Sequence, residues 1–332
     1  MKYPSEADRG PASAPGKRLR TLLLPLAVGA LLLAVLTLMA AETWKDYKST
    51  LINSQTQQME LVVQSISDSI RFSLEEYTDR LDAAAGKLRE NPSQPLNLSR
   101  SDSITDLWVE DAEGNIVYSR YGVRLVCDVL LTQDGKISYW QYHQGDHHYL
   151  VLKEPVDDRA VCLVVDSEAV YDQLVSDIHV GTNGYIVIKT ADNRIVMHPE
   201  SAQWGIDILE GRRKLYQQYK LDMSSLEELL AAQLAQPSGI MAYYSYWWTD
   251  PDLPRVQKIS AFRKLELGDS FWTVSAVVDY DDLYQPVARS FRKMAGMFCV
   301  IAGIMALLTL LLFRLQKKNN RSAARITALQ EV

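Results

Sequence analysis

The sequence predicts an α+β protein in which one long N-terminal helix runs along two tandem antiparallel sheets. One apolar helix precedes this region in the sequence and another follows it. Two hairpin patterns of the same design occur at residues 104–122 and 185–198. Apolar residues recur at steps of three and four over residues 42–90, and two uncharged apolar runs frame the whole. At 332 residues the chain can hold about two domains. We therefore expect both sheets to lie between the two apolar runs.

Composition excludes some classes of protein and leaves the cysteine chemistry open. The net charge of -6 argues against nucleic acid as a partner, and no Lys/Arg-rich face interrupted by aromatic residues suggests otherwise. Cys299 lies in an apolar run and is expected to be buried. Cys127 and Cys162 lie in separate strand-like segments, where they either pair or remain free thiols. No Cys/His spacing of a metal site occurs, and we expect no cofactor.

The first uncharged run, residues 21–41, has the length of a membrane helix, which needs roughly 20 apolar residues. The alternative is a cleaved signal peptide, whose apolar core is shorter, about 7–15 residues, and ends in an A-x-A-like site. The segment LMAAET fits such a site poorly. The basic residues before the run predict a cytoplasmic N-terminus.

The apolar repeat over residues 42–90 predicts one long helix or two stacked helices. At 1.5 Å per residue, a helix of about 49 residues reaches roughly 70 Å, enough to run along two small domains. Asn91 and Pro92 end it. The stripe can pack on a sheet, form a dimer interface, or do both. Its members are Leu51, Met59, Val62, Ile66, Ile70, Leu74, Tyr77, Leu81, Ala84 and Leu88.

The first sheet is predicted from a hairpin and the strand-like segments that follow it. Residues 104–122, ITDLWVEDAEGNIVYSRYG, combine a strand, an Ala-Glu-Gly-Asn turn and a second strand. Segments of turn composition separate the further strand candidates. These candidates are residues 126–131, 137–142, 148–153 and 161–166. A helix is expected at residues 168–179.

The second sheet begins with residues 181–199, GTNGYIVIKTADNRIVMHP. Asp192 and Asn193 form the hairpin turn because they tolerate left-handed backbone, and Pro199 ends the return strand because it has no N–H to donate. Residues 205–236 are expected to be helix and loop. Leu226, Leu229, Leu230 and Leu234 are assigned to one helix face. Three strand-like runs complete the sheet at residues 239–248, 256–265 and 271–278.

The second uncharged run, residues 295–313, predicts a second membrane helix. Basic residues follow it from Arg314 onward and predict a cytoplasmic C-terminus. The expected location is the plasma membrane, with both termini cytoplasmic and residues 42–290 extracytoplasmic. The tail at residues 314–332 is predicted to be helical and is too short for an output domain.

This order of segments resembles the double Cache domain, a PAS-like extracytoplasmic sensor module of bacterial transmembrane receptors. The GTNGY segment, the hairpin with its Asp-Asn turn and closing MHP, and the final FWTVSAVVDYDDLYQPV carry the resemblance, together with the two flanking apolar runs. The implied division is a tail at 1–20, a membrane helix at 21–41, a sensor domain at 42–290, a second membrane helix at 295–313 and a tail at 314–332. The implied sensor domain consists of a stalk helix at 42–91, a distal module at 100–168 and a proximal module at 180–284.

The resemblance implies a homodimeric receptor that binds a small extracellular ligand and relays the signal to a cytoplasmic output such as a histidine kinase, diguanylate cyclase or chemoreceptor module. The output would lie in a separate protein, or the chain is a shortened form of a longer receptor. The alternative is a membrane-anchored binding or scaffold protein of the cell envelope without signalling output. We expect no enzyme, because the sequence contains no GxSxG, P-loop or HExxH pattern.

Double Cache receptors bind their ligands in the distal module, so the resemblance implies a pocket there. The candidates are Tyr121, Arg124, Trp140, Tyr142 and Asp166, with Tyr118 nearby. An arginine can clamp a carboxylate with two hydrogen bonds, and an aspartate can accept from an amine. Asp166 matches the amine-binding aspartate of amino-acid receptors, but their Arg-Trp pattern is missing after Arg124. The resemblance therefore allows an amino acid or an organic acid as the ligand without selecting either.

Each candidate also has a structural interpretation. Asp166 can cap the helix that starts beside Ser167, and Tyr121, Trp140 and Tyr142 can pack across strands. The cluster of His143, His147 and His148 can bind a metal, but two of the three flank a Gly-Asp turn, which favours a solvated loop. His198 is expected to pack within the proximal module.

Overall fold

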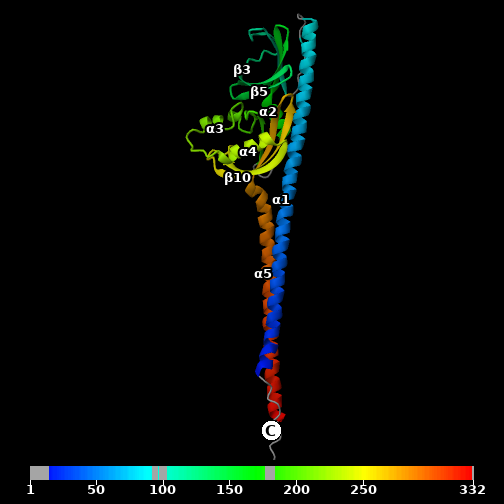
Figure 1. The fold of residues 1–332 in the computed structure, drawn as a ribbon, viewed down its shortest axis with the longest axis vertical. Helices are drawn as coiled ribbons and strands as arrows, with labels where there is room; N and C mark the ends of the chain where they lie inside the picture. The colour runs from blue at the N-terminus through cyan, green and yellow to red at the C-terminus, as the bar shows by residue number, and fades with distance from the viewer. Residues whose placement is uncertain (1–14, 92–95, 97–102, 176–183, 331–332) are drawn as a thin grey trace, which may run out of the picture. The chain divides into compact units, whose positions relative to one another are not determined.

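The computed structural model describes residues 15–91, 96, 103–175 and 184–330 (Figure 1). The chain divides into two compact units. The larger comprises Ile52–Gln285, and the smaller combines Met1–Leu51 with Pro286–Val332. The predicted long helix is α1 (Pro15–Glu90), and it ends where Asn91 and Pro92 predict.

The first sheet has six strands in the order β2-β1-β6-β5-β4-β3, and all neighbours are antiparallel. Its strands are β1 (Ile104–Glu110), β2 (Ile116–Ser119), β3 (Val126–Asp134), β4 (Ile137–Gln144), β5 (His147–Val156) and β6 (Arg159–Asp166). The predicted strands are confirmed. The strands around the Gly135 and Gly145 turns extend closer to those turns than the sequence pattern indicated.

The second sheet has five strands in the order β8-β7-β11-β10-β9, again antiparallel. Its strands are β7 (Tyr185–Thr190), β8 (Ile195–Met197), β9 (Ser238–Tyr246), β10 (Arg255–Leu267) and β11 (Ser270–Asp279). The predicted Asp-Asn turn joins β7 to β8, and Asn193 has the expected left-handed backbone, with a φ of 65°. The first three residues of the GTNGY segment lie outside the described residues.

Helices cover the outer face of the second sheet and connect the two sheets. They are α2 (Ser167–Val175), a short 3-10 turn (Ser201–Gln203), α3 (Glu210–Leu215) and α4 (Ser224–Ala235). The last helix, α5 (Tyr280–Gln330), follows β11. The predicted continuation of the helix at 168–179 beyond Val175 lies outside the described residues. On α4, three of the predicted leucines are buried, but the assignment of Leu234 is wrong because it is 58% exposed. Gln233 completes the buried i, i+3, i+4, i+7 stripe instead.

Residues 52–90 of α1 run along the inner faces of both sheets (Figure 1). The predicted stripe is buried there, from Met59 to Leu88, with Val62 half-buried and the side chain of Leu51 outside the described set. One continuous core therefore joins α1 to strands of both sheets. The stripe packs on sheets, which removes it as the basis for the predicted homodimer.

Trp272 of β11 links the two sheets through this core. It is fully buried, and its indole Nε1 donates to Oγ1 of Thr132 on β3 over 2.9 Å. Its ring meets the ring of Tyr139 edge-on at 5.7 Å. A side chain of the second sheet thus packs within the core of the first sheet.

The smaller unit pairs the beginning of α1 with α5. Trp44 and Phe291 bring their rings within 4.1 Å, and Gly29 lies against Thr309. Two helical segments, Ala27–Glu90 and Ala288–Asn319, are long and apolar enough to cross a membrane by length and composition. Almost none of the residues in their apolar windows are buried. Cys299 is exposed, which corrects its predicted burial.

The cysteines of the first sheet do not pair. Cys127 lies on β3 and Cys162 on β6, and both are free thiols. Strands β4 and β5 separate them, which puts them roughly 14 Å apart at about 4.8 Å per strand. A disulfide needs Cα atoms within about 7 Å.

Candidate functional site

The two faces of the first sheet carry different side chains. Leucines and valines of the face toward α1 belong to the shared core. Because side chains alternate along a strand, the neighbouring positions point to the other face. There Trp108, Tyr149, Val151, Cys162 and Val164 form a separate buried cluster. Leu125, Trp140 and Tyr142 pack against this cluster, which we call the aromatic face.

Strand register places two predicted site residues, Tyr142 and Asp166, in one row with Tyr149, which was not predicted. Tyr142 on β4 pairs with Tyr149 on β5, which in turn pairs with Asp166 on β6. The Tyr142 ring also meets Trp108 edge-on at 5.9 Å. Burial raises the pKa of the Tyr142 phenol above its ordinary value, so the side chain is a neutral hydrogen-bonding group. An acidic group and two phenols therefore lie side by side.

A partly buried ion pair lies on the same face. Lys153 on β5 pairs with the carboxylate of Glu110 on β1, and Nε1 of Trp108 donates to Glu110 over 3.0 Å. Strand β6 runs between β1 and β5, so the pair spans two strand spacings. Both charges are internally balanced, which makes this pair part of the scaffold of the face.

Asp106 holds the loop that carries two of the predicted ligand residues. This aspartate is fully buried in β1. One oxygen accepts from the N–H of Tyr121 at 2.9 Å, and the other accepts from Oγ of Ser119 at 2.7 Å and from the N–H of Val123 at 3.1 Å. The loop leading to Arg124 is thereby fixed to the sheet. Tyr121 is 41% exposed and Arg124 is also exposed.

At the other end of the aromatic face, Asp166 lies beside the start of α2. Its Oδ1 accepts the N–H of Ala169 at 3.0 Å, so it caps the helix as the structural interpretation predicts. Its Oδ2 lies 3.0 Å from Nε2 of His147, whose Nδ1 lies 2.9 Å from Glu168. The imidazole of His147 thus contacts two carboxylates, and this end of the aromatic face is acidic.

The cap predicts a difference between two substitutions of Asp166. Alanine removes the acceptor for the N–H of Ala169 and is expected to cost about 1 kcal/mol of unfolding free energy, whereas asparagine keeps a capping oxygen and costs little. Urea unfolding of the full chain in detergent measures both. Equal losses in Asp166→Ala and Asp166→Asn would show that charge rather than capping stabilises this end.

The structure brings Trp140, Tyr142 and Asp166 onto one face, and Tyr121 and Arg124 lie on the loop that joins the two outer strands, β2 and β3. Tyr118 does not join them. It packs against the shared core on the α1 side, and its hydroxyl donates to the carbonyl of Leu96 over 3.2 Å. In β2 it pairs with Val109, and the register turns both toward α1.

The three histidines of the β4–β5 hairpin contact different partners. His143 pairs with Asp128 at 2.5 Å, and His148 stacks on Trp204 with ring centres 5.4 Å apart. His147 lies on the aromatic face with Asp166. Within the described part of the chain, no group of three or more His, Cys, Asp or Glu side chains is arranged to hold a metal ion.

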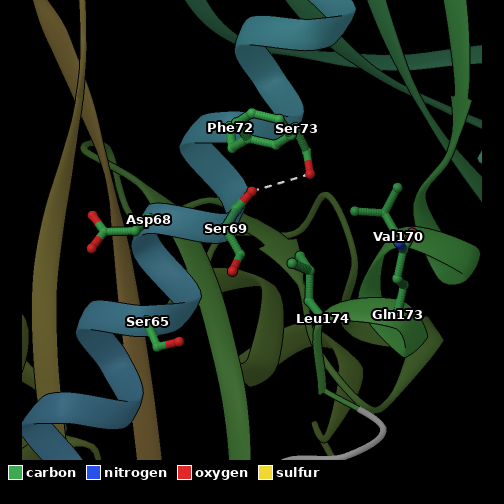
Figure 2. A pocket seen from close by; sticks show the side chains of 8 residues that line it. All are labelled: Ser65, Asp68, Ser69, Phe72, Ser73, Val170, Gln173 and Leu174. Atoms are coloured by element: carbon green, nitrogen blue, oxygen red, sulfur yellow. Dashed lines mark hydrogen bonds between the residues drawn. The ribbon is translucent and has the colours of Figure 1, made fainter.

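An open hollow of about 520 Å³ lies between α1 and α2 (Figure 2). It is lined from α1 by Ser65, Asp68, Ser69, Phe72 and Ser73, and from α2 by Val170, Gln173 and Leu174. Oγ of Ser73 donates to the carbonyl of Ser69 within the helix, as Figure 2 shows. The hollow has one charged side chain, so the aromatic face offers the richer chemistry.

No family model and no curated protein matches the chain. Among solved structures, the periplasmic sensory domain of the Campylobacter jejuni chemoreceptor Tlp1 is similar, with a TM-score of 0.46 and 11% identity over 71% of this chain and 99% of that one. The ligand-binding domain of the Pseudomonas fluorescens chemoreceptor CtaA, in complex with L-valine, has a TM-score of 0.46 and 13% identity over 69% and 99% of the two chains.

A further similar structure is an extracellular ligand-binding receptor from Desulfohalobium retbaense, with a TM-score of 0.40 and 11% identity over 66% of this chain. This chain spans 40% of the length of that receptor. These three distantly similar structures are named as sensory or ligand-binding domains and receptors.

Proposed function

We propose that the chain is a membrane-bound sensor that binds a small extracellular ligand on the aromatic face of its first sheet and relays the event to a separate cytoplasmic protein. The observation that carries the proposal is the arrangement of this face. It has an aromatic floor, an acidic end at Asp166, and an exposed Arg124 on the loop that Asp106 anchors.

The chemistry of the face favours a ligand with an amine and a carboxylate, or an organic acid. The carboxylate of Asp166 can accept from an ammonium group, and the guanidinium of Arg124 can bind a carboxylate with two parallel hydrogen bonds. The rings of Trp140 and Tyr142 supply an apolar wall, as small-molecule sites commonly require.

The membrane part of the proposal rests on the two flanking apolar helices. We propose that residues 21–41 and 295–313 cross the plasma membrane, that both termini are cytoplasmic and that the sheets face outward. The basic residues on the far side of each run support this orientation. Reporter fusions after residue 20, within the β5–β6 turn and after residue 332 test it, because only the middle fusion is expected to report an extracytoplasmic location.

A relay requires that the ligand prefer one of two arrangements of the protein. Two features of the chain suit this role. The helix α1 is continuous from Pro15 to Glu90 and packs on both sheets. The strand β11 ends at Asp279, and α5 begins at Tyr280 without an intervening residue. We propose that these two helices carry the displacement.

A thermal-shift screen of the full chain in detergent against amino acids, organic acids, amines and sugars tests the proposal. A specific ligand stabilises the protein by mass action, by about 2.7 kcal/mol at a hundredfold excess over Kd. Asp166→Asn and Arg124→Gln are expected to weaken the hit, whereas Asp158→Asn, an exposed acid in the β5–β6 turn, is not. The ligand site proposed here is wrong if all three variants bind alike, and the sensor itself is disfavoured if no compound binds.

A further inference from the structure

The second sheet encloses cationic side chains that lack carboxylate partners. Arg212 of α3 and Lys258 of β10 are only 2% and 0% exposed. Among the residues that the structure describes, no Asp or Glu forms an ion pair with either of them. Burying a charge without a counter-charge is strongly unfavourable. A negative charge bound near these side chains would therefore stabilise their protonated forms.

The two groups in direct contact with the guanidinium of Arg212 are neutral. Its Nε donates to Oε1 of Gln203 over 2.9 Å, and the plane lies over the ring of Trp248, 4.3 Å from the ring centre. The described residues offer no acceptor to its two terminal nitrogens. Burial lowers the pKa of Arg212 to about 10, so it still carries its charge at neutral pH.

Lys258 and His198 are two further basic groups in the interior of this part of the molecule. Burial, and then the charge of Arg212, lower the pKa of Lys258 well below its ordinary value. Its Nζ donates to the hydroxyl of Tyr185 over 3.0 Å and also to the carbonyl of Tyr246. Burial, and then the charges of Arg212 and Lys258, lower the pKa of His198 well below its ordinary value. Its Nδ1 accepts the N–H of Glu200, so Nε2 carries the hydrogen, and this donor has no partner among the described groups.

A cavity of about 20 Å³ lies beside Arg212, between the sheet and α4. Lys189, Gln233 and Ser260 supply polar side chains to its wall. All three are buried, and Oγ of Ser260 and Oε1 of Gln233 have no hydrogen-bond partner within the described structure. A space of this size holds about one group as large as a water molecule. The cavity is thus small and mostly apolar, with Arg212 and Lys189 as basic groups and Gln233 and Ser260 as neutral polar groups in its wall.

We propose that this cavity binds a small monovalent anion of the size of chloride against the guanidinium of Arg212. The hydroxyl of Ser260 donates to the same anion. Turning over the Gln233 amide points its N–H₂ at the anion and lets Oε1 accept from Ser275, whose hydroxyl lies 3.1 Å from the amide. The site lies in the second sheet and is independent of the aromatic face.

Thermal melting of the full chain in detergent tests the site. Sodium concentration and ionic strength are held constant while chloride replaces gluconate, an anion too large for the cavity. The melting temperature is expected to rise with saturation, by about 5–10 °C at a hundredfold excess over Kd. A melting temperature that does not respond to this exchange would overturn the proposal.

The two neighbouring arginines of α3 provide a matched pair of variants. Arg212→Met is expected to abolish the saturable response. Arg213→Met is expected to retain it, because Arg213 is exposed and paired with Glu210 and Glu227. Equal responses in both variants would refute the role of Arg212.

A second variant and a second measurement cover the case in which Arg212→Met does not fold. Ser260→Ala removes one donor to the anion and is expected to raise the Kd for chloride several-fold. Bromide bound beside Arg212 is expected to quench the fluorescence of Trp248, which is 3% exposed, with saturation at low concentration in the wild type. Quenching that is linear in bromide, together with an unchanged Kd in Ser260→Ala, would exclude the site.

Discussion

Replacing Trp272 by alanine is expected to destabilise the larger unit by about 3–5 kcal/mol, the usual cost of removing a large buried aromatic side chain. The indole is fully buried, packs on Tyr139 and donates to Thr132 on the other sheet. Its loss leaves a cavity at the junction of the two sheets. Denaturant unfolding of the full chain in detergent, followed by far-UV circular dichroism, measures the change.

Two milder substitutions separate the packing of Trp272 from its hydrogen bond. Trp272→Phe keeps most of the ring and loses the donor. Thr132→Val keeps the ring and leaves the buried N–H without an acceptor, which is expected to cost about 1–3 kcal/mol. A Trp272→Ala variant no less stable than Trp272→Phe would show that the ring contributes little packing.

Removing both cationic partners of Glu154 is expected to cost about 3–5 kcal/mol, because a buried carboxylate then lacks a counter-charge. The Glu154 side chain is fully buried in β5, and one oxygen accepts from Arg89 of α1 at 2.6 Å and from Lys136 at 2.7 Å. Its other oxygen has no partner in the described structure. The double variant Arg89→Met with Lys136→Met tests this by urea unfolding.

The triple variant that adds Glu154→Leu is the control for the double variant. Replacing a whole buried ion group by apolar residues is often neutral or stabilising, so the triple variant is expected to recover most of the lost stability. A triple variant as unstable as the double one would mean that the methionine side chains at positions 89 and 136 cause the loss, and that the charge of Glu154 does not.

The elements of the fold were readable from the sequence because their signals are local. The apolar repeat of α1 has the helical period, and the turns at Asp192–Asn193 and around Gly114 have residues that accept the required backbone. Strand ends were less accurate. The ladder between β9 and β10 continues to Arg255, which pairs with Tyr246. The local sequence pattern does not indicate this pairing.

The site could be predicted only in part, because the order of strands in a sheet depends on contacts between residues far apart in the sequence. Trp140, Tyr142 and Asp166 do share a face, but Tyr118 lies on the opposite one because the register of β2 turns it toward α1. Asp106 was missed altogether. Its signal was present, as an acidic residue between apolar neighbours in the strand ITDLWVE, where a buried carboxylate needs hydrogen-bond donors.

The buried cations of the second sheet were also missed, for a related reason. Arg212 lies in the sequence EGRRKL beside another arginine, and nothing local distinguishes the buried one from the exposed one. Only the position of α3 against Trp248 decides which guanidinium enters the interior.

The single core shared by α1 and both sheets has a thermodynamic consequence. Neither sheet can open fully without exposing apolar surface of the other, so the larger unit is expected to melt in one cooperative step. A molecule that binds to one sheet then raises the free energy of opening both. Amide hydrogens of β10 and β11, far along the chain from Asp166, would exchange more slowly when the aromatic face is occupied, and the gain in protection would be shared across the whole unit.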